Sequence, residues 1–307
     1  MSTGELLDRT FTLYKRNFLL FVGIAVPAPA IYLVFQLLTA ALTQPAGGAA
    51  ATTASGVGTK AIVGIVVGAC IAILGWMIGL AITQAATIRA VSAVHLARPT
   101  SVREAYAGIK GHFWRIIGVF ALVAVVVFGG SLLIYLAAMA ITFGAIAAAK
   151  TLGTLATIIG AIVGLAAIIT AVILGISLFV RYSLAVQACV VEDIPVIQSL
   201  KRSAFLAKGI RTRILTVYIL FAVLNAAISL TLVFGLDAVA APFRSVQLIA
   251  ALNALGTFLA GILAGPLATV AMSLVYYDER VRKEAFDLQL MMATLDGKES
   301  GMAASAS

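Results

Sequence analysis

The sequence predicts an all-α integral membrane protein that crosses a bilayer six times. Hydrophobic residues make up 62% of the 307 residues and charged residues only 11%, whereas soluble domains carry about 25% charged residues. The charged residues are also segregated along the chain, which excludes a soluble globular protein. Stretches without Asp, Glu, Lys or Arg cover 17–59, 61–88, 116–149, 151–180, 214–236 and 245–277.

Each charge-free stretch is long enough for a membrane-spanning helix. A hydrocarbon core of ~30 Å needs ~20 apolar residues in a helix, and only helices and closed barrels satisfy every backbone hydrogen bond there. The stretches are continuously apolar, whereas barrel strands would alternate. We therefore expect helices over 17–43, 61–91, 114–142, 152–185, 213–236 and 247–277.

Prolines and glycines predict how these helices bend and pack. Pro27 and Pro29 in the first span and Pro266 in the sixth remove backbone donors and should bend their helices. Small residues four positions apart let helix backbones approach each other in a membrane, and the even-numbered spans carry such pairs. These spans should form a tightly packed inner ring. Their paired glycines are Gly64, Gly68, Gly75, Gly79, Gly160, Gly164, Gly261 and Gly265.

Lysine and arginine residues predict the orientation. Eighteen of the 21 fall in the segments 1–16, 89–115, 181–213 and 280–298. Because cytoplasmic segments carry the excess of basic residues, both termini are expected in the cytoplasm, with the protein in the inner (plasma) membrane of the cell. The net charge of +9 then has a topological origin, and we expect no nucleic-acid partner.

A recurring segment predicts three parallel repeats. Residues 101–120 align with 199–218 at a shift of 98, and 6–23 joins them at a shift of 95. Each copy is an interfacial amphipathic helix followed by a two-helix hairpin, so the repeats would be related by a pseudo-threefold axis along the membrane normal. The expected repeats are 4–95, 99–194 and 195–295 of a single membrane domain, 1–295, followed by a disordered tail, 296–307.

The helix that opens each repeat should lie in the membrane interface. Leu6, Thr10 and Tyr14 share one helical face, with charged residues opposite. A lysine follows each such helix, where the chain turns into the bilayer, and can reach lipid phosphates. The residues expected to contact anionic phospholipid headgroups are Lys15, Lys110, Lys208, Arg115 and Arg213.

Three segments carry a resemblance to a known family. The opening GELLDRTFTLYKRNF, the connection VVEDIPVIQSLKRSAFLAKG and the closing YYDERVRKEAFDLQL resemble the bacterial glycerophosphoryl diester phosphodiesterase membrane domain family. The resemblance implies a six-span membrane protein without agreed catalytic residues. The founding architecture adds a soluble phosphodiesterase barrel of ~250 residues, whereas about 30 residues follow the last predicted span here.

A second group of polar residues lies at the inner ends of the even-numbered spans. A threefold arrangement could gather them into one polar cluster that binds a divalent cation or a cationic headgroup. The simpler interpretation, which we favour, is that they cap and pair at helix ends, with Asp278 bonded to Arg282. No cofactor or resident metal is expected, since no catalytic or metal-binding motif occurs. The residues are His95, Glu192, Asp193, Asp278 and Glu279.

Four amides lie within the predicted spans. Such residues can line a polar path, but they more often form hydrogen bonds between helices, which is the interpretation we favour. They are Gln36, Gln84, Asn225 and Asn253.

These observations favour a non-catalytic multi-pass membrane protein that associates with lipid, chiefly anionic phospholipid, or with a membrane partner or a second copy of itself. A transporter or channel for a small or amphiphilic solute is the first alternative, supported by the bent helices and the intramembrane amides. An enzyme acting on lipid headgroups through the cytoplasmic carboxylates is the second alternative. No catalytic residue is assigned.

Overall fold

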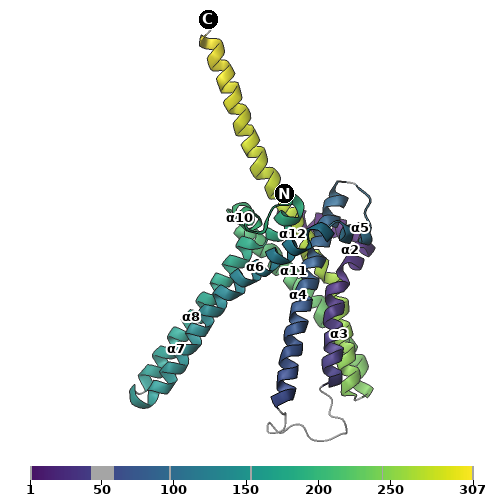
Figure 1. The fold of residues 1–307 in the computed structure, drawn as a ribbon, viewed down its shortest axis with the longest axis vertical. Helices are drawn as coiled ribbons and strands as arrows, with labels where there is room; N and C mark the ends of the chain where they lie inside the picture. Colours follow the sequence, from purple (N-terminus) through teal and green to yellow (C-terminus); the bar gives the residue numbers. More distant parts are fainter. Residues whose placement is uncertain (1, 43–58, 97, 153, 244, 306–307) are drawn as a thin grey trace.

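The computed structural model is helical throughout the residues that it describes, which are 2–42, 59–96, 98–152, 154–243 and 245–305 (Figure 1). By length and hydropathy, five helices can cross a membrane, and a bent pair of helices supplies a sixth span. The chain is therefore a multi-pass helical membrane protein, as its composition predicts.

The six spans follow the predicted order. The first is the bent pair, and the third is continued through a short π-helical turn, η2. The bounds are α2 Phe18–Ala25 with α3 Pro27–Leu42, α4 Thr59–His95, α6 Phe113–Ala124 with η2 Val125–Gly129 and α7 Gly130–Leu152, α8 Thr154–Tyr182, α11 Arg211–Ala240, and α12 Val246–Ser305.

Proline affects two of the spans differently. The axes of α2 and α3 differ by 44° at the break before Pro27, which confirms the predicted bend. Pro266 lies inside α12 without interrupting it. The same helix runs on to Ser305, where the sequence predicts a disordered tail over 296–307. The Ala, Met, Glu and Lys residues of that segment favour helix, and residues 306–307 lie outside the described part.

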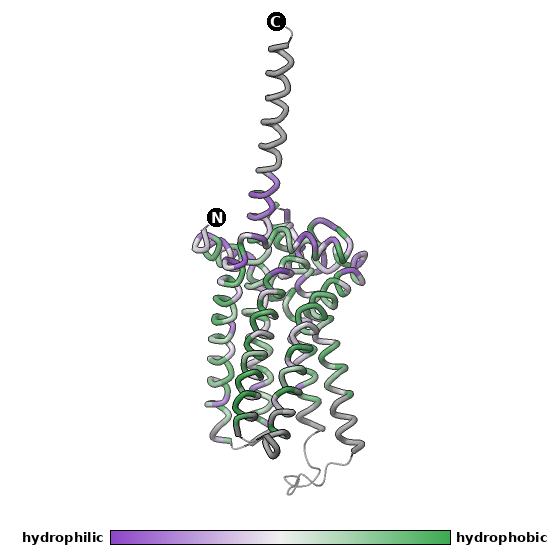
Figure 2. Tube along the Cα trace, turned by 90° about the vertical axis from the view of Figure 1, so that its left-hand side faces the viewer, coloured by the Kyte–Doolittle hydropathy of each residue, from purple (hydrophilic) through white to green (hydrophobic). Residues whose placement is uncertain are grey.

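Short helices gather at one end of the molecule, which we call the short-helix end (Figure 1). Hydrophilic residues concentrate there, and hydrophobic residues line the long helices (Figure 2). The short helices are α1 Thr3–Arg16, α5 Val102–Ala107, η1 Lys110–His112, α9 Ala185–Glu192 and α10 Val196–Leu206, and a further short turn, η3 Ala241–Phe243, joins α11 to α12.

The local sequence explains these short helices. Ser101 and Glu104 form a capping box at the start of α5, in which Ser101 Oγ accepts from the Glu104 amide at 3.3 Å and the Ser101 amide donates to Glu104 Oε2 at 2.9 Å. The sequence predicts that Leu6, Thr10 and Tyr14 of α1 face the membrane interface, whereas in the structure they are buried within the protein. The Tyr14 hydroxyl donates to the carbonyl of Leu263 on α12 at 2.7 Å, and burial raises the pKa of Tyr14 to about 12.

The main buried core lies at the short-helix end and contains residues of α1, α2, α4, α5, α6, α8, α9, α10, α11 and α12. Helix α12 is central: 61% of its most apolar 18-residue window is buried, against 6% for α11. Farther from that end, the α7–α8 hairpin diverges from α3, α4, α11 and α12 (Figure 1). The fourth span, α8, is therefore not part of a common inner ring.

Glycines do mark close helix contacts in this part of the molecule. A Cβ on Gly261 of α12 would lie 2.8 Å from the Pro29 ring of α3, and a Cβ on Gly79 of α4 would lie 3.2 Å from the Ala28 Cα. A Cβ on Gly164 of α8 would overlap the Thr142 hydroxyl of α7. These three contacts agree with the role that the glycine spacing predicts.

Candidate functional site

The acids of the expected polar cluster each have an arginine partner, beginning with Glu192 at the end of α9. Arg202 of α10 lies 3.0 Å from Glu192 Oε1 and also pairs with Glu284 of α12. The Tyr276 hydroxyl of α12 donates a short hydrogen bond to the same Glu192 oxygen. Burial alone would lower the pKa of Arg202. Its interactions with the two carboxylates raise the pKa by more than burial lowers it, so the net shift is upward. Glu192 thus joins three helices.

Asp193 belongs to a separate ion pair. It follows α9 with φ 56° and ψ 34°, the left-handed conformation that often ends a helix. Its carboxylate is 2.9 Å from His112 Nε2, and Arg115 Nη1 donates to both the Asp193 carboxylate and, at 2.9 Å, its carbonyl. Arg115, expected at a lipid headgroup, is instead engaged by this loop.

Asp278 and Glu279 share a third site. Arg213 Nη1 lies 2.8 Å from Asp278 Oδ2 and 3.1 Å from Glu279 Oε1. The side chains of Arg213 and Glu279 are only 13% and 3% exposed. Arg213 is therefore a buried ion-pair residue, which corrects its expected place at a headgroup. Arg282, expected to pair with Asp278, approaches Glu279 at 3.6 Å.

His95 takes no part in these ion pairs. Its ring stacks on Tyr277 with centroids 5.2 Å apart and an interplanar angle of 9°. Within the described ranges, no group of three or more His, Cys, Asp and Glu residues could hold a metal ion. The structure thus divides the expected cluster of His95, Glu192, Asp193, Asp278 and Glu279 among separate partners.

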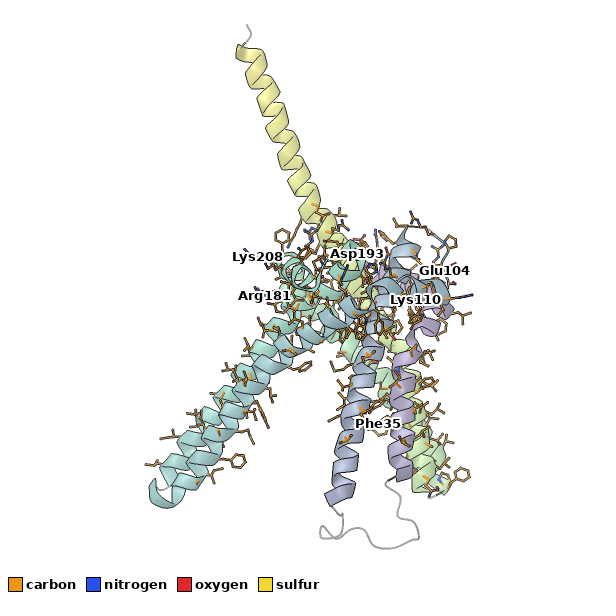
Figure 3. All side chains as sticks on the ribbon, viewed as in Figure 1. Phe35, Glu104, Lys110, Arg181, Asp193 and Lys208 are labelled. Carbon is orange, nitrogen blue, oxygen red and sulfur yellow. The ribbon has the colours of Figure 1, made fainter. Side chains whose placement is uncertain are left out.

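The remaining basic candidates are different. Lys15 ends α1, Lys110 follows α5, and Lys208 follows α10. All three side chains are exposed, and none forms an ion pair with any residue that the structure describes. Lys110 and Lys208 lie with other charged residues at the short-helix end (Figure 3). After Lys208, Gly209 takes φ 90°, which lets the chain turn into α11.

A cavity of about 670 Å³ lies between α3, α4, α11 and α12. Its wall is mainly apolar and aromatic, with Tyr32, Phe35 and Trp76 among the lining residues. Serine and threonine hydroxyl groups are spread over three of the four helices. They belong to Thr83, Thr87, Ser229, Thr257 and Thr269.

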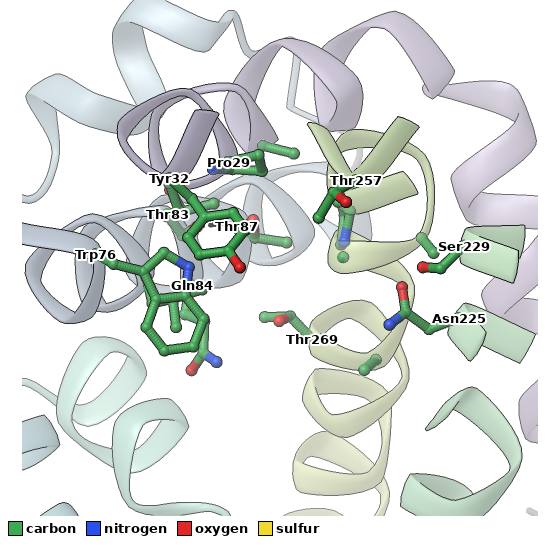
Figure 4. A pocket seen from close by; sticks show the side chains of 18 of the residues that line it. Pro29, Tyr32, Trp76, Thr83, Gln84, Thr87, Asn225, Ser229, Thr257 and Thr269 are labelled. Carbon is green, nitrogen blue, oxygen red and sulfur yellow. Dashed lines mark hydrogen bonds between the residues drawn. The ribbon is translucent and has the colours of Figure 1, made fainter. Parts of the chain in front are cut away.

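Two of the four predicted intramembrane amides line this cavity. Gln84 lies on α4 and Asn225 on α11, and Figure 4 shows them on different sides of the open space. Neither amide side chain has a hydrogen-bond partner in the described part of the chain. For these two residues, the expected bond between helices is wrong.

The other two amides do not line the cavity. Gln36 of α3 is half-buried, and Asn253 of α12 accepts a hydrogen bond from Thr257 at its carbonyl. The Oδ1 of Asn253 is buried and has no partner among the described residues. Two of the four amides therefore line the cavity and two do not. Their positions within apolar stretches of the sequence do not distinguish the two cases.

Sequence reasoning missed two groups of site residues. The cavity aromatics Tyr32 and Trp76 have no signal that separates them from lipid-facing aromatics. The sequence also does not single out Arg202 and Tyr276. The predicted topology does place both residues on the same side of the membrane as the acids, which is the one signal that could have found them.

Comparison with known proteins gives no further assignment. No protein-family model, no curated protein and no solved structure matches the chain.

Proposed function

We propose that this chain is a non-catalytic membrane protein that associates with anionic phospholipid through the short-helix end. Lys15, Lys110 and Lys208 support the proposal, because these exposed lysines have no ion-pair partner in the described residues and lie at or just after the ends of three separate short helices. Arg115 and Arg213, which are held by acids, are left out of the lipid contact.

The proposal includes the orientation and the membrane. With both termini in the cytoplasm of a bacterial cell, the short-helix end meets the inner leaflet of the plasma membrane. That leaflet is anionic, and each basic residue near it contributes up to about 1 kcal/mol, screened by salt. Three lysines would therefore enrich anionic lipid without holding any single molecule tightly.

The test replaces Lys15, Lys110 and Lys208 together with Gln. We expect the amount of phosphatidylglycerol that copurifies with the protein, measured by mass spectrometry of extracted lipid, to fall about fivefold to tenfold. The variant should fold normally, because none of the three replaced lysines takes part in an ion pair with a described residue.

A charge-matched control separates position from net charge. Arg9→Gln, Arg103→Gln and Lys201→Gln remove the same three charges from exposed sites on α1, α5 and α10. These residues lie earlier in the short helices, away from the points where the chain turns into a span, so their loss should change the retained lipid by less than twofold. Equal loss of phosphatidylglycerol from both triple variants would mean that net charge alone controls lipid retention. Unchanged lipid in the lysine variant would mean that the three lysines serve only to set the orientation in the membrane.

A transporter for an amphiphilic solute is a second candidate, and the cavity between α3, α4, α11 and α12 favours it. Lipid-headgroup chemistry has less support, since each of its proposed carboxylates is engaged by an arginine. Solute uptake into liposomes that contain the purified protein, compared with empty liposomes, tests the transporter.

The family and the repeat belong to the same proposal. In chain order, α1, α5 and α10 each come before a pair of spans, with η1 following α5 and α9 preceding α10, and this order supports three units. The pseudo-threefold axis and membership in the glycerophosphoryl diester phosphodiesterase membrane domain family remain predictions, as does association with a membrane partner or a second copy. Crosslinking in native membranes would test the last of these.

A further inference from the structure

The cavity lies at a depth where water is scarce. Gln84 is eleven residues before the end of α4, which corresponds to ~16 Å along the helix axis. Asn225 is fourteen residues after the start of α11, or ~21 Å. In a hydrocarbon core of ~30 Å, Asn225 therefore lies near the middle of the bilayer, and Gln84, which is five residues or ~8 Å before Arg89, lies within the core but nearer the short-helix end.

The polar groups at this depth lack protein partners. Besides Gln84 and Asn225, the Tyr32 hydroxyl, the Trp76 indole and the Ser229 hydroxyl form no hydrogen bond to residues of the described ranges. Unsatisfied donors and acceptors are costly in a hydrocarbon environment. Figure 4 shows Tyr32, Trp76 and Gln84 on one side of the cavity and Asn225 and Ser229 on the other. A molecule in this space can satisfy both sides.

The lining also restricts the charge of that molecule. None of the described lining residues is Asp, Glu, Lys, Arg or His. A phosphate or an ammonium group would be desolvated here without an opposite charge, which is strongly unfavourable. The bound polar group must therefore be uncharged and must form hydrogen bonds.

The size and the wall restrict the rest of the molecule. The volume of about 670 Å³ lies within the 300–1,000 Å³ of sites that enclose small molecules. The apolar and aromatic wall suits a hydrocarbon chain, and a whole two-chain phospholipid with its headgroup is too large. One chain with a compact polar group fits.

We propose that the cavity between α3, α4, α11 and α12 is a binding site for an uncharged, single-chain lipid whose hydroxyl or ester group bonds to Gln84 and Asn225. This site is independent of the lysines at the short-helix end, because it lies at another depth and selects against the charge that the lysines attract. The two lipid contacts can therefore fail separately.

The experiment titrates the purified full-length protein in detergent with monooleoylglycerol and counts bound lipid by native mass spectrometry. Lysophosphatidic acid with the same oleoyl chain is the comparison probe, since it differs by the phosphate. We expect one saturable monooleoylglycerol, with an affinity at least tenfold higher than that of lysophosphatidic acid. Equal affinity for the two probes, or no saturable binding of monooleoylglycerol, would overturn the proposal.

Two pairs of variants place the lipid in the cavity. Gln84→Leu with Asn225→Leu should weaken monooleoylglycerol binding about tenfold, whereas Gln36→Leu, an intramembrane amide outside the cavity, should change it less than twofold. Gly265→Leu should also weaken binding about tenfold, because Gly265 lines the cavity with no atom within 4 Å of an added Cβ. Gly235→Leu, equally open but away from the cavity, is its control. Identical behaviour within either pair would exclude this site.

Discussion

The short-helix end and the spans beyond it are held together by different interactions. At the short-helix end, Arg202 and Arg213 bond to carboxylates on other helices, and ten of the described helices contribute to a buried core. Beyond it, the helices touch along narrow contacts of small residues, such as Gly261 on Pro29, and leave a cavity. The difference follows from the solvent: charge pairing and apolar burial act where water competes, whereas close packing acts where lipid does.

The largest expected difference between the short-helix end and the far ends of the spans is the side of the bilayer that each one faces. Gly111 near the short helices and Gly144 near the far end of α7 are both exposed, with no atom within 4 Å of an added Cβ. In a background with Cys70 and Cys189 replaced by alanine, Gly144→Cys should react with an impermeant maleimide added to intact cells. Gly111→Cys should react only after permeabilisation. The reverse pattern would invert the proposed orientation.

Next in size is the loss of a buried charge at the short-helix end. Arg213→Leu leaves Asp278 and Glu279 without their shared cation, and breaking such a pair costs about 3 kcal/mol. We expect a clearly lower unfolding temperature in detergent. Arg211→Leu, an exposed site two residues earlier, should change it little.

Rescue identifies the cause of that destabilisation. Adding Asp278→Asn and Glu279→Gln to Arg213→Leu should recover part of the lost stability, since the two buried negative charges that Arg213 balances are then removed with it. If the triple variant is less stable than Arg213→Leu alone, the loss comes from packing of the arginine stem.

The smallest effect concerns the spans. Gly261→Ala places a Cβ against the rigid Pro29 ring, and such overpacking costs about 1–3 kcal/mol. Gly265→Ala, one turn along α12, meets open space and should be neutral or up to about 1 kcal/mol stabilising, because alanine favours helix. Unfolding followed by tryptophan fluorescence compares the two. Equal destabilisation would mean that the α3–α12 contact does not depend on this glycine.

Composition was enough to predict the spans, because the cost of placing charge in a bilayer acts on each residue alone. The bend before Pro27 was predictable for a similar reason, since proline acts on its own backbone. The inward faces of α1 and α5 follow from helical periodicity, although the buried Tyr14 and the partly buried Tyr106 bond to protein carbonyls, Tyr106 to that of Ile24.

The partners of charged and polar residues were not predictable in this way. Arg115 and Arg213 bond to residues 78 and 65 positions away, so their ion pairs depend on how whole helices are placed. The cavity was not predictable for the same reason, because it also depends on how whole helices are placed. It is formed by the first, second, fifth and sixth spans, while the third and fourth diverge, and a strict threefold arrangement would have hidden that difference.

The π-helical turn η2 sets the angular phase of the third span. A π turn adds one residue to a helix, and one residue corresponds to a rotation of about 100°. Before the turn, α6 directs Ile116 and Val119 into the core; after it, Ser131 and Thr142 of α7 meet Gly175 and Gly164 of α8. Removing a single residue from Val125–Gly129 would carry Ser131 and Thr142 about 100° around the helix and away from those glycines. The one extra residue of the π turn thus lets the third span face the core before the turn and α8 after it.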